Sequence, residues 1–419
     1  MPLQSRYADA RNTLKAWLDS GVLVPDDVPA LYVYEQSGPG ILQRGLIGDV
    51  GLADPGQRII LPHEDVFPGP IADRLALMST TQANLEPIFL LYEGENGTAT
   101  RLVDEVASNR HPLVSARTED GLTHRLWAIT DPAEITAINA DLHPRQALIA
   151  DGHHRYATYR VLQRQERATQ ASAPGGTHQA RLPQASSSTS PENRPHPADP
   201  VGAQPPVSGH AAATEPVQAD DPSPGAGEPT PGPWDFGLAL LVDTSAYPPD
   251  LKAIHRVIQG LPAADAAARA KSSWQVHDYT DLELGLAALE RAAEPAFLLA
   301  DGNGSHLLTD PDPVQLARAM PADHSDRWNS LNTSVLTEFV LPVVWDMRDN
   351  DETVRIVHHD TDAAVRLAIR TGGTAVILKP LAIEDVLAVA EGGERVPRKS
   401  TSFGPKPRTG LVLRTFATD

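Results

Sequence analysis

The chain has 419 residues, of which 41% are hydrophobic, and a formal net charge of −19. This length exceeds what one ordinary core accommodates and predicts two domains. The negative charge argues against binding nucleic acid or anionic lipid through bulk charge. The absence of cysteine excludes disulfides, thiolate metal sites and cysteine nucleophiles.

The first 23 residues have the pattern of an amphipathic helix, with Leu14, Trp17 and Leu18 on one side, and do not resemble a signal peptide. The longest apolar runs, such as residues 236–242, are too short to span a bilayer. We therefore expect a soluble, cytoplasmic protein with no membrane partner. The sequence does not indicate an oligomeric state.

Strands and helices are predicted in mixed order over residues 1–167. Alternating or continuous apolar runs predict strands at 31–36, 42–52, 87–93, 124–130 and 146–150. Helical periodicity predicts helices at 73–82, at 131–142 after an Asp-Pro start signal, and from 153 to 167.

Residues 168–233 have a different composition. They hold 14 of the chain's 38 prolines and no Phe, Trp or Tyr. Such a segment cannot bury enough apolar surface to offset its ordering entropy, so we expect a disordered insert rich in Pro, Ser and Ala. An interaction tether is one interpretation of it, and a tolerated surface insertion is the more conservative one.

Strands and helices alternate again over residues 234–419. Strands are predicted at 234–243, 274–280, 295–301, 305–310, 353–360 and 374–380, and helices at 282–292, 361–372 and 382–393. The fold class is therefore α/β or α+β with mixed sheets. The expected division is an N-terminal region at 1–167, the insert at 168–233 and a C-terminal α/β region at 234–419.

The stretch DGHHR, Asp151 to Arg155, lies where the strand at 146–150 meets the next helix. A helix N-terminus offers unpaired N–H groups and a positive dipole end to an anion. Gly152 would allow close backbone approach, and Arg155 could bind phosphate oxygens in a bidentate manner. His153 and His154 could donate hydrogen bonds or transfer protons, and Asp151 could cap the helix or hold a metal. A capped helix with satisfied polar side chains is the structural alternative.

Two further clusters carry titratable groups. His63 and Glu64 could form a base, an orienting pair or metal ligands, although on a strand they would point to opposite faces. The loop at 395–409 concentrates cations and hydroxyls in an acidic chain and favours phosphate or carboxylate binding over a solvated basic loop. Its candidate binding residues are Lys399, Ser400, Thr401 and Lys406. Neither a Walker A motif nor a GxGxxG motif is present.

These blocks, in order, resemble a prokaryotic family of unknown function, numbered one thousand and fifteen. The resemblance rests on RGLIGDVGL, LPHEDVFPGPIADR, IADGHHRY, HRVI and KSTSFGPK, and spans the chain outside 168–233. Family members usually begin with a further segment that contains a Pro-Tyr-Asp element. This chain begins without it, so a catalytic group located there would be missing.

The DGHHR turn is also distantly similar to the phosphate-binding turn of the ParB/sulfiredoxin superfamily, which includes free-serine kinases. This resemblance implies a ParB/sulfiredoxin-like strand–turn–helix in 1–167 and a nucleotide, ATP or ADP with Mg²⁺. It reaches only residues 151–155. No position matches the kinase's catalytic acid with confidence, and Glu64 is the substitute candidate.

Three hypotheses remain open from the sequence. The first is a nucleotide-dependent phosphotransferase or nucleotide hydrolase acting on a small hydroxyl metabolite, possible acceptors including free serine, with Glu64, His153 and His154 as catalytic candidates. The second is a non-enzymatic regulatory protein that binds a nucleotide through the same turn. The third is a metal-dependent hydrolase using Asp151, His63, His153 and His154, although adjacent helical histidines point about 100° apart.

Overall fold

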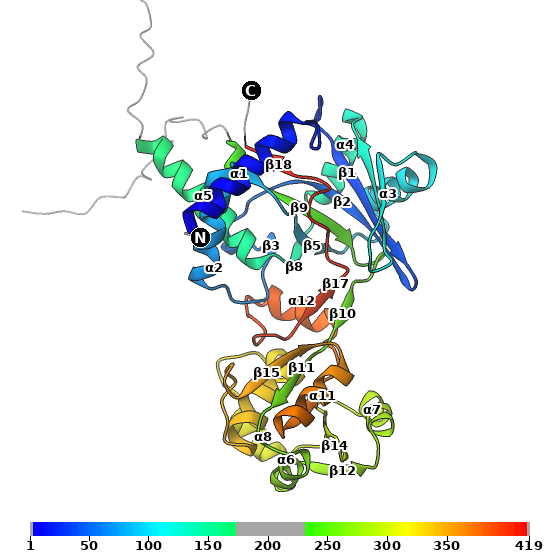
Figure 1. The fold of residues 1–419 in the computed structure, drawn as a ribbon, viewed down its shortest axis with the longest axis vertical. Helices are drawn as coiled ribbons and strands as arrows, with labels where there is room; N and C mark the ends of the chain where they lie inside the picture. Colours follow the sequence, from blue (N-terminus) through cyan, green and yellow to red (C-terminus); the bar gives the residue numbers. More distant parts are fainter. Residues whose placement is uncertain (1–2, 173–230, 417–419) are drawn as a thin grey trace, which may run out of the picture. The chain divides into compact units, whose positions relative to one another are not determined.

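The computed structural model describes residues 3–172 and 231–416 (Figure 1). Most of the predicted disordered insert lies outside the described residues. Met1–Arg167 and Gly232–Asp419 form one compact unit. The unit combines several mixed and antiparallel sheets with helices, which confirms the expected mixed α/β class.

The first sheet has eight strands in the order β3-β8-β5-β9-β2-β1-β7-β6. Their bounds are β1 (Leu31–Gly38), β2 (Ile41–Gly51), β3 (Ile60–Leu61), β5 (Ile88–Tyr92), β6 (Val114–Arg117), β7 (Thr123–Ile129), β8 (Ala147–Asp151) and β9 (Phe236–Asp243). The pairs β3–β8 and β5–β9 are parallel, whereas the other pairs are antiparallel. This arrangement places the end of β8, and with it the DGHHR turn, inside the sheet rather than at an edge.

The first half of the chain also contributes the helices α1 (Leu3–Asp19), η1 (Pro55–Gln57), α2 (Pro68–Thr81), α3 (Thr98–Asn109), α4 (Pro132–Leu142) and α5 (His153–Ser172). The Asp131 carboxylate accepts a hydrogen bond from the Ala133 amide and begins α4, as the Asp-Pro signal predicts. Helix α3 was not predicted. Its buried side chains, Ala99, Thr100, Val103 and Val106, are mostly small, so the sequence pattern is weak.

The second sheet has six strands, all antiparallel, in the order β12-β14-β13-β16-β11-β15. Its strands are β11 (Ile254–Ile258), β12 (Gln275–Tyr279), β13 (Phe297–Asp301), β14 (Gly304–Thr309), β15 (Val354–His358) and β16 (Thr374–Ile377), and its main helices are α6 (Ala263–Ala270), α7 (Leu282–Arg291) and α11 (Thr361–Thr371). Helix α11 packs on β11, β13 and β16 (Figure 1). Most of these elements match the predicted ones, but α6 and β11 were not predicted.

Shorter elements connect the two sheets. They are η2 (Pro233–Asp235), β10 (Asp250–Lys252), α8 (Pro313–Ala319), α9 (Asp326–Asn329), α10 (Asn332–Val335), the π-helix η3 (Leu336–Val344), α12 (Ile383–Glu391), β17 (Ser402–Gly404) and β18 (Arg414–Thr415). Strand β10 pairs with β17, and β18 pairs with β4 (Ala83–Asn84). The chain therefore leaves the first sheet beside β10 and returns beside β17.

The segments on the two sides of the insert share one hydrophobic core. Strand β9 lies between β2 and β5. The side chains of Val386 and Val389 on α12 are fully buried in the same cluster as Tyr34, Phe89 and Leu240 of the first sheet. Strand β9 therefore completes the first sheet and α12 packs in its core, although both elements follow the insert in sequence.

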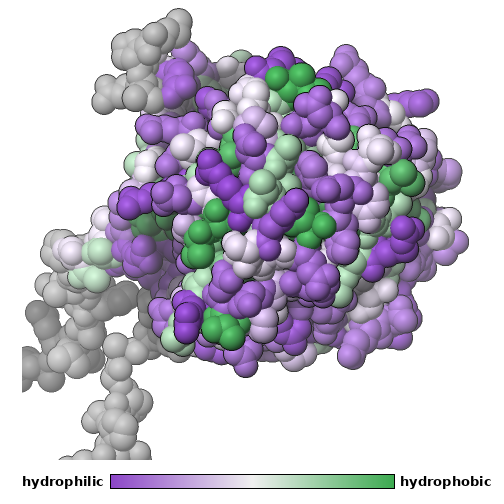
Figure 2. All heavy atoms as spheres, turned by 90° about the horizontal axis from the view of Figure 1, so that it is seen from below, coloured by the Kyte–Doolittle hydropathy of each residue, from purple (hydrophilic) through white to green (hydrophobic). Residues whose placement is uncertain are grey.

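The surface view in Figure 2 is largely hydrophilic, with hydrophobic side chains in small separate groups. Among the described residues, no helix combines the length and apolar character that crossing a bilayer requires.

Candidate functional site

The DGHHR turn joins strand β8 to helix α5. Gly152 has φ 99°, a region that favours glycine, and a Cβ there would lie 2.9 Å from Cγ2 of Ile88. The Tyr156 amide donates to the Gly152 carbonyl at 2.9 Å and makes the first bond of the helix. The amides of residues 153–155 therefore precede the helical hydrogen-bond pattern, as expected for an anion-binding N-terminus.

A cavity of about 360 Å³ lies at this turn. Most of its lining residues come from three segments that are far apart in sequence: the turn itself, the loop that follows Leu61, and the loop at 396–406. Arg74 of α2, Ile254 of β11 and His358 of β15 complete the walls. The lining residues include Glu64, Asp65, Phe67, Arg74, Asp151, Gly152, His153, His154, Arg155, His358, Arg398, Lys399, Thr401 and Lys406. The structure thus brings Arg155 and the basic loop to one cavity.

Asp151 holds two of these cations. Its Oδ1 accepts a hydrogen bond from Nζ of Lys406 at 2.6 Å, and its Oδ2 accepts one from Nη2 of Arg155 at 2.6 Å. Nη1 of Arg155 also donates to the carbonyl of Pro87 at 2.6 Å. The Asp151 carboxylate is therefore engaged in positioning Lys406 and Arg155, and the helix-capping and metal-ligand roles considered for it are not what this geometry favours.

Two other cations at the cavity remain available to a ligand. Arg74 and Lys399 line it and form no ion pair within residues 3–172 and 231–416. Arg398 differs, because its guanidinium is bonded to Asp349 and Asp351. Unpaired cations beside a helix N-terminus favour a phosphate-bearing ligand.

A buried arginine holds the backbone of the basic loop. Nη2 of Arg256 donates to the carbonyls of Arg398, at 3.2 Å, and Lys399, at 3.0 Å, and Nη1 donates to the carbonyl of Ile254. Burial lowers the pKa of Arg256 to about 10, so the side chain remains charged at neutral pH. Lys399 has φ 55°, and Arg256 fixes this left-handed residue at the cavity wall. The HRVI block thus supports the loop.

Ser400 is not brought to the cavity. Its hydroxyl donates to Pro397 O at 2.5 Å and lies 2.9 Å from the Thr333 hydroxyl, and the residue is 3% exposed. The neighbouring Thr401 takes the opposite direction and lines the cavity. Consecutive residues of an extended segment alternate in direction, which separates these two predicted binding residues.

Glu64 lies at the centre of a polar cluster in the cavity wall. The Thr401 hydroxyl donates to Oε1 of Glu64 at 3.1 Å, and Nε2 of His63 lies 2.9 Å from the same hydroxyl. Nδ1 of His153 is 3.6 Å from Oε2 of Glu64. Residues 62–67 form a loop and not a strand, so His63 and Glu64 reach one cluster. The alternation of side chains along a strand therefore does not separate His63 from Glu64.

Burial changes the protonation of this cluster. It raises the pKa of Glu64, an effect that the Thr401 hydrogen bond and the charge of Lys399 oppose. It lowers the pKa of His63 to about 4 and the pKa of His153 well below its ordinary value, with the positive partner charges adding to the effect on His153. Both histidines are thus neutral at pH 7 beside a carboxylate of raised pKa.

The hydrogen bonds assign a tautomer to His153. The backbone N–H of His63 donates to Nε2 of His153 at 3.2 Å, so the neutral ring carries its hydrogen on Nδ1, toward Glu64. One ligand atom from each of His63, Glu64 and His153 lies within 4.8 Å of the others, which is close enough for a shared metal. However, the Nδ1 that faces Glu64 is protonated, and a protonated ring nitrogen cannot ligate.

His154 points away from this cluster. Its Nε2 accepts a hydrogen bond from the Phe67 amide at 3.0 Å, and its ring stacks on the Phe67 ring. The pKa of His154 is lowered, first by burial and then by the charges of Arg74 and Lys399. His153 therefore contacts Glu64 and His154 contacts Phe67, in different directions, as the 100° spacing of adjacent helical residues predicts.

The sequence interpretation did not assign Arg74, Phe67, Asp65 or His358 to the site, although all four line the cavity. The block LPHEDVFPGPIADR contains three of them and was considered only for His63 and Glu64. His358 ends β15, as predicted, and its position at the cavity could not be derived from the strand pattern.

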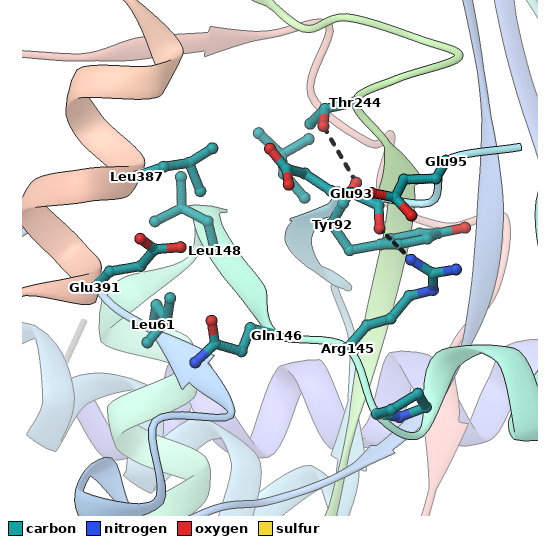
Figure 3. A pocket seen from close by; sticks show the side chains of 12 residues that line it. Leu61, Tyr92, Glu93, Glu95, Arg145, Gln146, Leu148, Thr244, Leu387 and Glu391 are labelled. Atoms are coloured by element: carbon teal, nitrogen blue, oxygen red, sulfur yellow. Dashed lines mark hydrogen bonds between the residues drawn. The ribbon is translucent and has the colours of Figure 1, made fainter. Parts of the chain in front are cut away.

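A second cavity, of about 260 Å³, lies elsewhere in the first sheet (Figure 3). Its lining includes the carboxylates of Glu93, Glu95 and Glu391 and an apolar wall that contains Leu387. Arg145 also lines it, but its guanidinium is bonded to Asp141 and to the carbonyl of Glu93. This charge balance does not suit an anionic ligand.

Comparison with solved structures gives distant likenesses. A free serine kinase in complex with AMP is 11% identical with a TM-score of 0.36, over 85% of this chain and 87% of that one. A conserved hypothetical protein from Pyrococcus furiosus is 11% identical with a TM-score of 0.34, over 85% and 90%. A C-terminally truncated SbnI from Staphylococcus aureus is 10% identical with a TM-score of 0.35, over 85% and 82%. At this distance no activity or ligand carries over to this chain.

No curated protein matches the chain. A family model described as "Protein of unknown function (DUF1015)" matches residues 2–187, which include the LPHEDVFPGP and DGHHR blocks. The match ends before the C-terminal half, so the assignment of the KSTSFGPK block to the same family stays a prediction. The match to residues 2–187 agrees with the resemblance that the N-terminal motifs indicate.

Proposed function

We propose that the protein is a nucleotide-dependent phosphotransferase that acts on a small metabolite bearing a hydroxyl group. One observation carries the proposal: the helix N-terminus at 153–155, the free cations Arg74 and Lys399, and the carboxylate of Glu64 line a single cavity. Phosphoryl transfer requires positioning and charge neutralisation above all, and these groups supply both.

The phosphates would lie between the start of α5 and the basic loop. The amides of 153–155 and the side chains of Lys399 and Arg74 would bind phosphate oxygens. Arg155 and Lys406 add positive charge from their positions on Asp151. This division of roles follows from which cations at the cavity form no ion pair with another described residue.

Glu64 would be the general base. Burial raises the pKa of Glu64, which makes its carboxylate a better proton acceptor than an ordinary one. In the transfer step the acceptor oxygen forms a bond to the terminal phosphorus, the bond from that phosphorus to the bridging oxygen breaks, and the hydroxyl proton moves to Glu64. His153 and Thr401 would hold Glu64 in place as positioning residues.

The nucleotide in this proposal is ATP or ADP with Mg²⁺. Carboxylate oxygens suit this cation, and Asp65 provides one at the cavity that no ion pair engages within the described residues. Asp65 would hold the cation together with phosphate oxygens, and the cation would neutralise phosphate charge. Mg²⁺ is thus compatible with the residues present.

The test compares wild type, Glu64→Gln and Lys399→Asn. Binding of ATP and ADP is measured by calorimetry with Mg²⁺, and transfer to serine, threonine and glycerol is followed by ³¹P NMR. We expect Glu64→Gln to bind nucleotide with near wild-type affinity and to lose transfer, and Lys399→Asn to lose affinity. Failure of wild type to bind either nucleotide would refute the proposal.

A nucleotide-binding regulator with the same cavity is the alternative. The same assay separates it, because such a protein binds nucleotide and transfers phosphate to no acceptor. A metal-dependent hydrolase has weaker support, since only the proximity of His63, Glu64 and His153 favours it and the tautomer of His153 opposes it. Metal analysis of purified protein distinguishes this third function.

A further inference from the structure

The cavity of about 360 Å³ at the DGHHR turn, in which the proposed phosphates would lie, is called the phosphate cavity below. A smaller cavity, of about 220 Å³, adjoins it, and Arg74 and Arg155 line both. Helix α2, the segment around β4 and helix α5 form its walls. Half of its lining residues are apolar or aromatic, namely Leu77, Met78, Ala83, Leu85 and Tyr159. An apolar cavity joined to a cationic one is suited to a ligand that has two chemically different ends.

The polar residues of the smaller cavity are mostly engaged. The amide oxygen of Asn84 accepts hydrogen bonds from the Leu238 amide and from Arg414. Asp73 accepts one from the Tyr7 hydroxyl at 2.5 Å. Glu86 pairs at 3.3 Å with Arg155, one of the two residues that line both cavities, and is about half exposed. Arg74 and Arg155, which line both cavities, and Glu86, which pairs with Arg155, mark the junction, and the apolar side chains supply the remaining contact surface.

We propose that this cavity binds the adenine end of the nucleotide whose phosphates occupy the phosphate cavity. Contact with Leu77, Met78 and Tyr159 would remove the faces of the base from water, whereas phosphates require the cations on the other side of the junction. The ribose would pass Arg155 and Glu86, whose donors and acceptors suit its hydroxyls. The inference rests on the proposed function, because it needs a nucleotide in the phosphate cavity.

The alternative cavity does not fit this ligand. The cavity of Figure 3 carries the carboxylates of Glu93, Glu95 and Glu391 and shares no lining residue with the phosphate cavity. A base bound there would not share its cavity with the cations that hold the phosphates. The cavity next to Arg74 and Arg155 meets both requirements.

Leu77→Trp tests the inference, because it fills the smaller cavity from α2 and leaves the residues of the phosphate cavity unchanged. Ser79→Trp is the matched control, since Ser79 is exposed on the same helix and lines neither cavity. Calorimetry uses ADP and inorganic pyrophosphate, the second of which has no base. We expect Leu77→Trp to weaken ADP binding at least about tenfold and pyrophosphate binding less than about twofold, and Ser79→Trp to change neither.

Two outcomes overturn the inference alone: equal ADP affinity for Leu77→Trp and wild type, or wild-type ADP binding no tighter than pyrophosphate binding. If wild type binds neither probe, the proposed function fails as well. Photolabelling of wild type with 8-azido-ADP gives a second measurement that needs no folded variant. Label in residues 73–86 or at Tyr159 supports the inference, and label confined to other peptides contradicts it.

Discussion

Nζ of Lys406 lies 2.6 Å from Oδ1 of Asp151, although 255 residues separate them in the chain. This contact joins the DGHHR turn to the basic loop, two segments that come from opposite sides of the insert. Asp151 also binds Arg155 through its other oxygen. One carboxylate therefore sets the positions of two cations at the cavity, and the chain closes the site only when its second half has folded onto the first.

Lys406→Ala should weaken pyrophosphate binding about fivefold, because the cavity loses a cation and the charge of Asp151 is left partly uncompensated. The Lys406 side chain is 57% exposed, so the free energy of unfolding should fall by less than about 1 kcal/mol. Calorimetry and urea unfolding check both values. Lys252→Ala is the control, since Lys252 forms a comparable exposed pair with Asp250 and does not line the cavity. Unchanged affinity in Lys406→Ala would place the phosphate elsewhere.

Lys399→Asn should weaken pyrophosphate and ADP binding about tenfold with little loss of stability, because Lys399 forms no ion pair within the described part of the chain. Asparagine tolerates the left-handed backbone at this position, φ 55°, and so isolates the loss of charge. The salt dependence of affinity should also decrease. Equal affinity for the variant and wild type at low salt would exclude Lys399 from the site.

Arg155→Ala should behave differently from Lys399→Asn. It removes the bonds to Pro87 and Asp151, so the free energy of unfolding should fall by about 2 kcal/mol in addition to any loss of affinity. Urea unfolding without ligand measures this difference. A fully stable Arg155→Ala protein would show that these bonds do not hold the turn.

Gly152→Ala should destabilise the protein by about 2–3 kcal/mol, because a Cβ would meet Ile88 at 2.9 Å in a backbone region of positive φ. Gly121→Ala is the matched control, since Gly121 has φ 84° and open space around its Cβ direction. It should cost only about 1 kcal/mol. Thermal or urea unfolding of the two variants separates the cost of backbone strain from the cost of the close contact with Ile88. If both variants lose the same free energy of unfolding, Ile88 moves away from the new Cβ at no measurable cost.

Stability should fall as the pH drops from about 6.5 to 4. The folded pKa of His63 is about 4, against an ordinary value of 6.5, so the unfolded chain binds a proton that the folded chain does not. Burial of neutral His63 therefore contributes about 3 kcal/mol to the free energy of unfolding. This contribution is fully present above pH 6.5 and is lost as the pH falls toward 4. His153 acts in the same direction. Urea unfolding across this range gives the slope.

His63→Gln should reduce that slope, whereas His143→Gln, at an exposed position, should leave it unchanged. The glutamine amide can still donate to the Thr401 hydroxyl, which preserves part of the cluster. If the free energy of unfolding of His63→Gln falls with pH as steeply as that of wild type, buried His63 does not cause the loss of stability between pH 6.5 and 4.

The sequence predicted the elements that are long and strongly periodic. The strands at β1, β2, β5, β8 and β13 and the helices α4, α7 and α11 appear within a few residues of their expected bounds. Helix α6 was missed because its buried side chains are all alanines, which make a weak apolar stripe. Strand β11 was missed because His255 and Arg256 interrupt its apolar run, yet both are buried in the structure.

The candidate residues of the turn and of the basic loop could also be named from the sequence, because a strand–turn–helix and a cluster of cations are local features. What the sequence could not provide is which of their side chains share the cavity. Ser400 turns into the core and Thr401 turns toward Glu64, although both have a hydroxyl and stand side by side.

By itself, then, the sequence predicted the mixed α/β class, the family whose model matches residues 2–187, and the candidate residues at 151–155 and 399–406. Only the tertiary structure decided that Asp151 binds Lys406 and Arg155, and that Arg74 and Lys399 form no ion pair within residues 3–172 and 231–416. It also decided that β9 completes the first sheet and that α12 packs in its core. The reason is physical: periodicity and capping depend on neighbours within a few residues, whereas these contacts join segments hundreds of residues apart and depend on how the sheets pack.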